Sequence, residues 1–189
     1  PRSSDLKTID SLKRLQGKGI QLPITVNVSV RDFSHGDLAD RNESKMAKAR
    51  LPTSLLGIEC LETERILESP AAIKGLEMLK QRGFGIALDD FGTGYSNISY
   101  LRRMPLDVIK IDRSIVSGLT TDTAARIITK SIIAMLKELD YVVLAEGVEN
   151  SETLEALKEL GCDQAQGFFH SRPLPEDEID RWLSWKMKV

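Results

Sequence analysis

The sequence predicts an α/β protein of the (β/α)8 barrel type, and three observations support this fold class. Short β-branched runs alternate with amphipathic helical stretches, the pattern of parallel strands joined by helices. The runs are largely apolar, as strands are when both faces of a sheet are buried. Nearly every run carries a polar residue at its C-terminal end, and a barrel gathers these ends at one mouth. The alternative, an open doubly wound sheet, would spread them along a line.

The expected elements follow one another in a regular order, beginning with a helix-like stretch over Leu6–Gln16. Strands are expected at Leu22–Val30, Leu55–Cys60, Gly83–Asp90, Leu106–Asp112, Tyr141–Gly147 and, more weakly marked, at Asp163–Phe169. Helices are expected at Ala71–Gln81, Ala124–Leu139, Glu152–Leu160 and Pro175–Trp185, with a poorly periodic one at Leu38–Arg50. Gly83 and Gly161 follow two of these helices, where glycine commonly ends a helix.

Length and composition fit a single domain over residues 1–189, of which 41% are hydrophobic. The chain has 26 basic and 28 acidic residues, so its net charge of −2 argues against DNA as a partner. No apolar run reaches the ~20 residues of a membrane span. Cys60 and Cys162 lie far apart without metal-ligand spacing, which predicts free thiols and a cytoplasmic location.

The polar residues at the strand ends suggest a metal centre. They are Asn27, Glu59, Asp89 with Asp90, Lys110, Glu146 and Gln166. Oxygen ligands without clusters of histidine or cysteine favour Mg²⁺ or Mn²⁺ over zinc. Metal charge would also explain two adjacent aspartates at the end of one strand, since it offsets their repulsion. Paired metals serve displacement at phosphorus, so we expect a phosphodiester substrate.

Lys110 and two glycines add detail to this mouth. Lys110 would orient the attacking water or neutralise developing charge. The alternative for Lys110 is a structural salt bridge to a neighbouring carboxylate. Gly92 and Gly94 would let the chain after Asp90 turn sharply and approach a ligand or a second subunit closely.

Five motifs in order resemble one known family. They are "VNVS" at 26–29, "DDFGTGYS" at 89–96, "IKID" at 109–112, "AEGVE" at 145–149 and "QGFFHSRPLP" at 166–175. Together they resemble the EAL domain, whose members hydrolyse cyclic di-GMP to linear pGpG in bacterial second-messenger signalling. The resemblance covers the chain from about Leu6 to its end, and it implies a modified (β/α)8 TIM-like barrel.

The resemblance also implies roles for individual residues. It implies Asn27, Glu59 and Asp89 as metal ligands, with Asp90 and Glu146 at a second metal or its water. Lys110 would lie near the nucleophilic water, with Glu146 as a candidate base. Glu62, Glu149 and Gln166 would support the site. The loop Phe91–Ser96, with Phe91, Gly92, Thr93 and Gly94, would connect the site to a homodimer interface. Family members often carry a diguanylate cyclase or sensor domain as well.

The chain departs from the family pattern in three places. Leu61 stands where threonine is usual, and Asn97 replaces a usual serine. The family's first two strands, the second of which carries the Glu-Ala-Leu signature, are not found. The tripeptide Glu155–Leu157 lies inside a predicted helix and is not that signature.

These departures leave more than one function open. We expect an incomplete phosphodiesterase domain that is inactive alone for want of the signature glutamate. The alternatives are a catalytically inactive cyclic di-GMP receptor or protein-interaction module on the same scaffold, and an unrelated barrel hydrolase of other phosphodiesters.

Overall fold

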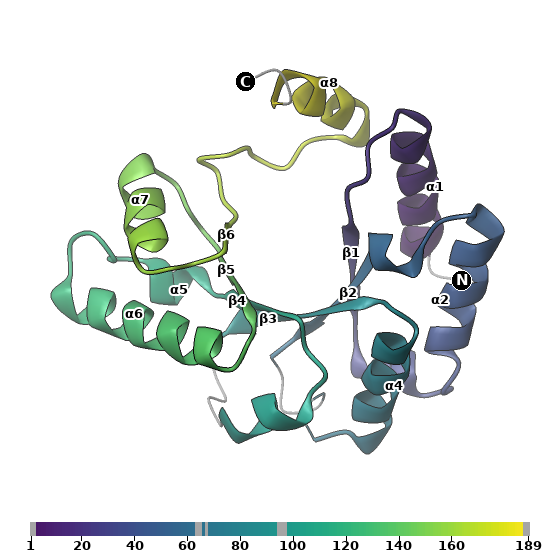
Figure 1. The fold of residues 1–189 in the computed structure, drawn as a ribbon, viewed down its shortest axis with the longest axis horizontal. Helices are drawn as coiled ribbons and strands as arrows, with labels where there is room; N and C mark the ends of the chain where they lie inside the picture. Colours follow the sequence, from purple (N-terminus) through teal and green to yellow (C-terminus); the bar gives the residue numbers. More distant parts are fainter. Residues whose placement is uncertain (1–2, 63–65, 67, 94–97, 187–189) are drawn as a thin grey trace.

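The computed structural model describes residues 3–62, 66, 68–93 and 98–186. These residues form one parallel six-stranded sheet whose strands lie in sequence order. The strands are β1 (Ile24–Val28), β2 (Leu56–Leu61), β3 (Gly85–Phe91), β4 (Val108–Ile111), β5 (Val142–Ala145) and β6 (Gln164–Ala165). Parallel crossovers are almost always right-handed, so strands in sequence order place their helices on the same face. Figure 1 shows the helices around the outside of the curved sheet.

This arrangement confirms the predicted barrel-type fold class. A doubly wound sheet reverses its strand order at a switch point and carries helices on both faces, whereas the order here runs from β1 to β6 without reversal. The α-helices are α1 (Ser3–Gly17), α2 (Leu38–Ala49), α4 (Pro70–Gln81), α5 (Arg113–Val116), α6 (Thr123–Glu138), α7 (Ser151–Glu159) and α8 (Glu176–Lys186). Short 3-10 turns occupy Val30–Phe33 (η1), Thr53–Leu55 (η2) and Ile98–Arg103 (η3).

Local sequence explains where the main helices begin. Ser69 caps α4 by accepting a hydrogen bond from the Ala72 amide, and Pro70 follows it at the first helical position. Asp122 caps α6 in the same way through the Ala124 amide. Capping satisfies amides that a helix cannot pair internally, and each such cap contributes about 1 kcal/mol.

A row of buried residues across four strands forms the centre of the core. Cys60, Leu88, Ile109 and Val143 are partners in register on β2 to β5, and each is fully buried. Successive side chains of a strand point to opposite faces. Glu59, Asp89 and Lys110 are direct sequence neighbours of these core residues, so they face the concave side of the sheet. Because the core residues occupy the convex face, the residues next to them in sequence must point to the concave face.

One weakly marked prediction is confirmed and another is cut short. The expected helix at Leu38–Arg50 is present as α2, and its narrow buried stripe, which includes the polar Asn42, explains the weak periodicity. The expected strand Asp163–Phe169 is reduced to Gln164–Ala165. Beyond it, the chain bonds to the loop after β5 through the backbone of Val148, and a Cβ on Gly167 would lie 2.1 Å from the Val148 carbonyl oxygen. The chain therefore continues in close backbone contact with this loop instead of as a strand.

The two ends of the described chain meet beside the sheet. Asp180 of α8 pairs with Arg14 of α1 and with Lys18 just after α1, and the Ser11 hydroxyl donates to Glu176. Figure 1 shows α8 next to α1, across the opening between β6 and β1. Within the described residues, β1 pairs only with β2, and β6 only with β5. None of the helices in this part of the chain has the length and apolar character needed to cross a membrane.

Candidate metal centre and active site

Lys110 lies at the centre of the carboxylate cluster on the concave face. Its ammonium nitrogen is 2.7 Å from an Asp89 oxygen, 2.8 Å from a Glu146 oxygen and 3.0 Å from a Glu59 oxygen. These residues come from β2, β3, β4 and the residue after β5. Glu59 and Lys110 are both buried. The structure thus brings together four of the residues predicted from the strand ends.

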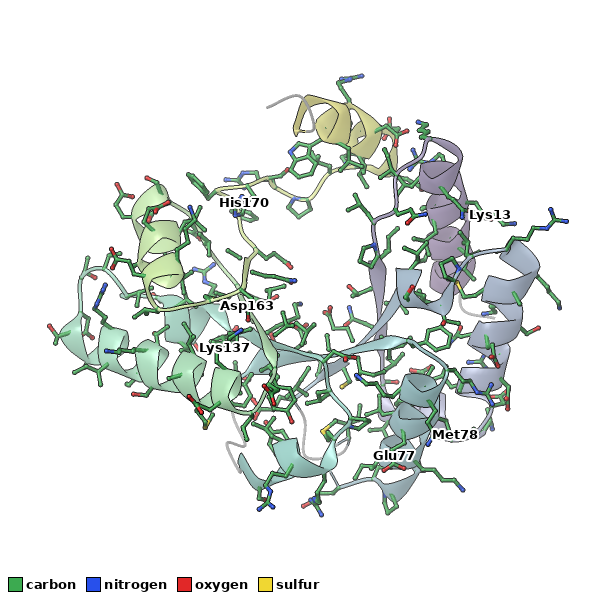
Figure 2. The ribbon with its side chains drawn as sticks, viewed as in Figure 1. Lys13, Glu77, Met78, Lys137, Asp163 and His170 are labelled. Atoms are coloured by element: carbon green, nitrogen blue, oxygen red, sulfur yellow. The ribbon has the colours of Figure 1, made fainter. Side chains whose placement is uncertain are left out.

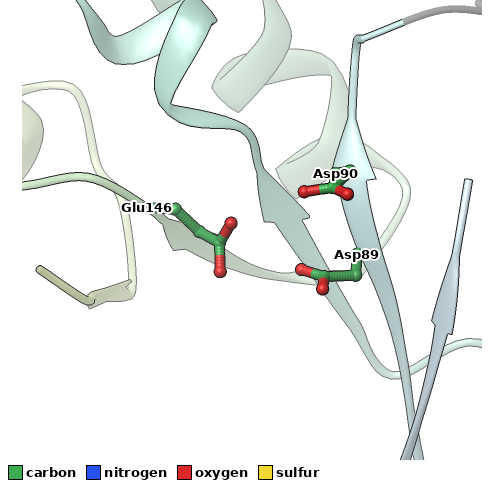
Figure 3. Close-up of side chains that lie close together, drawn as sticks. All are labelled: Asp89, Asp90 and Glu146. Atoms are coloured by element: carbon green, nitrogen blue, oxygen red, sulfur yellow. The ribbon is translucent and has the colours of Figure 1, made fainter. Parts of the chain in front are cut away.

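A β-bulge allows both adjacent aspartates to reach the cluster. In a regular strand, Asp89 and Asp90 would point to opposite faces. The register between β3 and β4 shifts between Leu88 and Phe91, and Asp90 adopts a left-handed backbone with φ of 59°. One oxygen each of Asp89, Asp90 and Glu146 lies within 4.8 Å of the others, and Figure 3 shows the three carboxylates converging. Left-handed non-glycine residues are strained and concentrate at functional sites.

Glu62 anchors the turn that follows the two aspartates. Its backbone amide donates to the Asp89 carbonyl at 3.0 Å, and its carboxylate accepts from the Gly92 amide at 2.7 Å. Gly92 has φ of 97°, a conformation that other residues rarely adopt, and a Cβ there would displace the end of the Ile115 side chain, so glycine is strongly favoured. Phe91 is buried, and the amide and hydroxyl of Thr93 both donate to the Asp90 carbonyl. Gly94, the other predicted glycine, lies outside the described residues.

The site contains more negative charge than Lys110 can neutralise. Burial alone would lower the pKa of Lys110, but its hydrogen bonds to Asp89, Glu146 and Glu59 outweigh burial and raise the pKa, so it stays an ammonium. Burial, together with the charges of Asp89 and Asp90, raises the pKa of Glu146 more than Lys110 lowers it. Burial and then the charge of Asp89 raise the pKa of Asp90, and burial and the hydrogen bond with Asp89 raise that of Glu59. One ammonium thus faces four carboxylates.

This excess of negative charge fits divalent cations. The cluster supplies carboxylate oxygens, and Asn27 on β1 lies in register beside Glu59 and offers an amide oxygen. The nearby Cys60 belongs to the buried row on the other face. A set of hard oxygen donors suits Mg²⁺ or Mn²⁺ rather than a thiolate-binding metal. The residues present therefore fit the metal that the sequence predicts.

The other predicted site residues lie away from the cluster. Glu149 is exposed and pairs with Arg113 at 3.6 Å. Gln166 is exposed, and its backbone bonds to Ala145 at 2.8 Å and to Val148 at 3.0 Å, on either side of Glu146. Gln166 thus holds the loop that carries Glu146 through its main chain.

Sequence reasoning missed two residues that contact predicted site residues. The buried hydroxyl of Tyr100 donates to Glu62, and Arg113 is the ion-pair partner of Glu149. Tyr100 is 38 residues from its partner, and neither its neighbours nor its spacing mark it as part of the site. Arg113 comes directly after the "IKID" motif, so its position beside that motif could have marked it as a residue near the site.

A curved parallel sheet with an acidic, lysine-centred cluster at the C-terminal strand ends is typical of a TIM-like barrel, and the cluster is a candidate metal centre. The chain belongs to the EAL domain family, whose model matches residues 6–173. MucR of Pseudomonas aeruginosa, named a bifunctional diguanylate cyclase/cyclic di-GMP phosphodiesterase, is 36% identical over 165 residues, which is 87% of this chain and 24% of MucR.

Solved structures show the same likeness. That of PaMucR phosphodiesterase in complex with c-di-GMP has a TM-score of 0.82 at 33% identity, covering 93% of this chain and 78% of the other. The manganese/cy-diGMP complex of BlrP1 from Klebsiella pneumoniae has a TM-score of 0.80 at 30% identity. The match covers 91% of this chain and 45% of the BlrP1 chain. The chain spans only about a quarter or less of the length of the first curated relatives it matches, 21% and 24% in two cases.

Proposed function

We propose that this chain carries a metal-dependent phosphodiesterase centre that hydrolyses cyclic di-GMP to linear pGpG. The observation that carries this proposal is the convergence of Glu59, Asp89, Asp90 and Glu146 around Lys110. The family match and the cyclic di-GMP complexes of structural neighbours support the choice of substrate. An excess of carboxylates attracts the cations that a doubly charged phosphodiester ring needs in order to bind an acidic site.

The cluster divides into two groups of ligands for Mg²⁺ or Mn²⁺. We assign Asn27, Glu59 and Asp89 to one ion, and Asp90 and Glu146 to a second ion or its water. When bound, such ions lower the pKa of water and neutralise phosphate charge. The bulge at Asp90 serves this division, because it brings a second carboxylate from the same strand to the site.

Lys110 and Glu146 act on the water and the phosphate. The Lys110 ammonium pairs with Asp89, Glu146 and Glu59 at 2.7, 2.8 and 3.0 Å, which engages all three of its N–H groups. It can donate to the attacking water or to a phosphate oxygen once one of these carboxylates binds a cation instead. Glu146, whose pKa burial raises, accepts the proton of that water. Glu149 and Gln166 support the rim and the Glu146 loop.

A second copy of the chain is the partner that we assign to the face beside the site. Phe91, Gly92, Ile115, Ile128, Ile132 and Met135 line an apolar groove there. Ile127 and Ile128 on α6 are exposed to 60% and 52%. Exposed apolar surface of this kind is typical of protein interfaces. Since Gly92 belongs both to the groove and to the turn after Asp90, a dimer through this face would connect the two sites.

The remaining assignments concern the wider protein. We propose that residues 1–189 belong to a single domain whose barrel is closed by two further strands between β6 and β1. The name of MucR supports a diguanylate cyclase domain, and that of DosP, an oxygen sensor protein of Escherichia coli, supports a sensor domain in the parent protein. Cys60 and Cys162 are free thiols, in line with a cytoplasmic location.

The test is turnover of cyclic di-GMP by the protein as its gene encodes it, with Mg²⁺ or Mn²⁺, followed by HPLC separation of substrate and pGpG. Asp89→Asn should reduce turnover by ~10²-fold or more, the scale of losing a key electrostatic contact. Asp177→Asn, an exposed carboxylate on α8, is the matched control and should leave turnover unchanged. Tight nucleotide binding without cleavage in the unaltered protein would favour the receptor function instead, and full turnover by Asp89→Asn would refute the site.

A further inference from the structure

Tyr100 contacts the carboxylate of Glu62, the residue that anchors the turn at Asp90. Its ring is buried in η3, and its hydroxyl donates to one oxygen of Glu62 at 2.5 Å. The other Glu62 oxygen accepts from the Gly92 amide at 2.7 Å, and the Glu62 amide donates to the Asp89 carbonyl at 3.0 Å. Glu62 thus contacts the chain on both sides of Asp90. Tyr100 in turn fixes the Glu62 carboxylate.

We propose that Tyr100 is a positioning residue of the metal centre, which aims the Asp90 carboxylate by holding Glu62 against Gly92. The inference rests on the proposed function, because it gives Tyr100 a part in arranging the ligands of that site. Tyr100 does not reach the cluster itself. It acts through one carboxylate and one backbone amide.

The left-handed backbone of Asp90 gives such support a function. This conformation is uncommon for a residue other than glycine, although aspartate tolerates it better than most, so the contacts around Asp90 help to hold it in place. The described contacts that hold it are those of Glu62 to Asp89 and Gly92, and the turn bonds of Thr93. Without Tyr100, the buried Glu62 carboxylate would keep the Gly92 bond but lose the bond that sets its orientation.

Tyr100 is suited to this task because its hydroxyl remains a donor. Burial, and then the hydrogen bond to Glu62 and its negative charge, raise the pKa of Tyr100 far above its usual range. This direction favours the protonated phenol, which can donate to Glu62. A buried polar group that is left unpaired costs free energy, so the Tyr100–Glu62 hydrogen bond should be kept in the folded protein.

The test compares Tyr100→Phe with Tyr141→Phe. Both changes remove one tyrosine hydroxyl from the same region, but the Tyr141 hydroxyl donates to the Leu101 carbonyl at 2.7 Å rather than to Glu62. The first measurement is hydrogen exchange of the Gly92 amide by NMR. Tyr100→Phe should accelerate it by about 5- to 10-fold, the scale of one weakened hydrogen bond, while the amides of β5 stay unchanged. Tyr141→Phe should not alter Gly92.

The second measurement is binding of Mn²⁺ alone, titrated by EPR. Tyr100→Phe should weaken it by about 10-fold, the lower end of the effect seen for residues behind metal ligands, and Tyr141→Phe should not. In turnover assays, kcat should fall while KM for the nucleotide changes little.

The two proposals fail in different ways. If the unaltered protein binds no Mn²⁺ and cleaves no nucleotide, the proposed function fails, and Gly92 exchange still decides whether Tyr100 positions the turn. If Tyr100→Phe matches Tyr141→Phe in both Gly92 exchange and Mn²⁺ affinity, the positioning role is refuted.

Discussion

Lys110 bonds three carboxylates at once, and this geometry allows two roles to be separated. A lysine that positions water or stabilises developing charge acts mainly in the transition state, whereas a salt-bridge lysine supports the site before the reaction begins. The two roles change different kinetic constants, so substitution can distinguish them.

Lys110→Ala should therefore lower kcat by ~10²-fold or more while weakening nucleotide binding far less. Steady-state kinetics give the first quantity and calorimetry with a non-hydrolysable analogue the second. Lys80→Ala is the control, because Lys80 also pairs with an aspartate, Asp107, but outside the cluster. Equal losses of kcat and affinity in Lys110→Ala would identify it as a structural salt bridge.

At this scale, the sequence predicts side-chain chemistry better than backbone shape. Glu59, Asp89, Lys110 and Glu146 could be found because each occupies the end of an apolar run, where a barrel gathers its ligands. The left-handed backbone of Asp90 could not be found in this way, because it depends on Glu62, which is distant in the sequence and contacts Asp89 and Gly92 on either side of Asp90. The adjacent aspartates predict a site, but they do not predict the β-bulge that brings both carboxylates to the same face of the sheet.

At the scale of the elements, two aspartates each link a helix to two strands, at the N-terminal ends of the strands, opposite the carboxylate cluster. Asp107 precedes β4 and accepts from the Ile86 amide of β3 at 2.9 Å and from Lys80 of α4. Asp163 precedes β6 and accepts from the Val143 amide of β5 at 2.8 Å. It also accepts from Lys137 of α6 at 2.6 Å, and Figure 2 shows this pair. Each aspartate joins a helix and two strands.

Asp163→Asn should lower the free energy of unfolding by about 1 kcal/mol at pH 7. Burial alone would raise the pKa of Asp163, but Lys137 and the Val143 amide outweigh it and lower the pKa below the ordinary ~3.9 of the unfolded chain. The stabilisation is therefore present above pH ~4 and is lost as pH falls through the folded-state pKa.

Urea unfolding from pH 7 down to about pH 3.5 measures this effect, with the exposed Asp177→Asn as the control. The difference between the unaltered protein and Asp163→Asn should narrow below pH ~4. A difference that stays constant over the whole range would show that the charge of Asp163 does not contribute.

At the scale of the whole molecule, the open sheet should limit activity. In the described residues β1 and β6 each have one free edge, and the predicted ligand Asn27 is exposed on β1. A catalytic constellation needs sub-ångström positioning, and free strand edges promote association with other chains. We therefore expect residues 1–189 alone to turn over cyclic di-GMP at least ~10²-fold more slowly than a domain with a closed barrel.

The comparison is an HPLC assay, with Mg²⁺ and Mn²⁺, of residues 1–189 alone and of the same residues preceded by whatever the gene encodes upstream of Pro1. About 50 further residues would approach the ~250 of a full barrel. Equal turnover by the two proteins would show that Asn27, Glu59, Asp89, Asp90 and Glu146 suffice.

The overall topology could be predicted because it follows from the order of strands and helices along the chain. Alternating strands and helices specify consecutive parallel pairs, and Asp163 and Asp107 reinforce the same neighbours. The contact of α8 with α1 could not be predicted, because it depends on ion pairs between Asp180 and the distant Arg14 and Lys18. Surface charges of this kind carry no periodic signal.

The sequence order of the strands also has a consequence for synthesis on the ribosome. Each strand after β1 pairs with the strand made just before it, so the sheet can grow one unit at a time as the chain emerges. The carboxylates that we propose as metal ligands are distributed from β2 to the residue after β5, and Glu146 is the last of them to be synthesised. A nascent chain that ends before Glu146 would present an incomplete set of these ligands. On the proposed assignment, tight binding of a cation would therefore wait until the sheet around the site has formed.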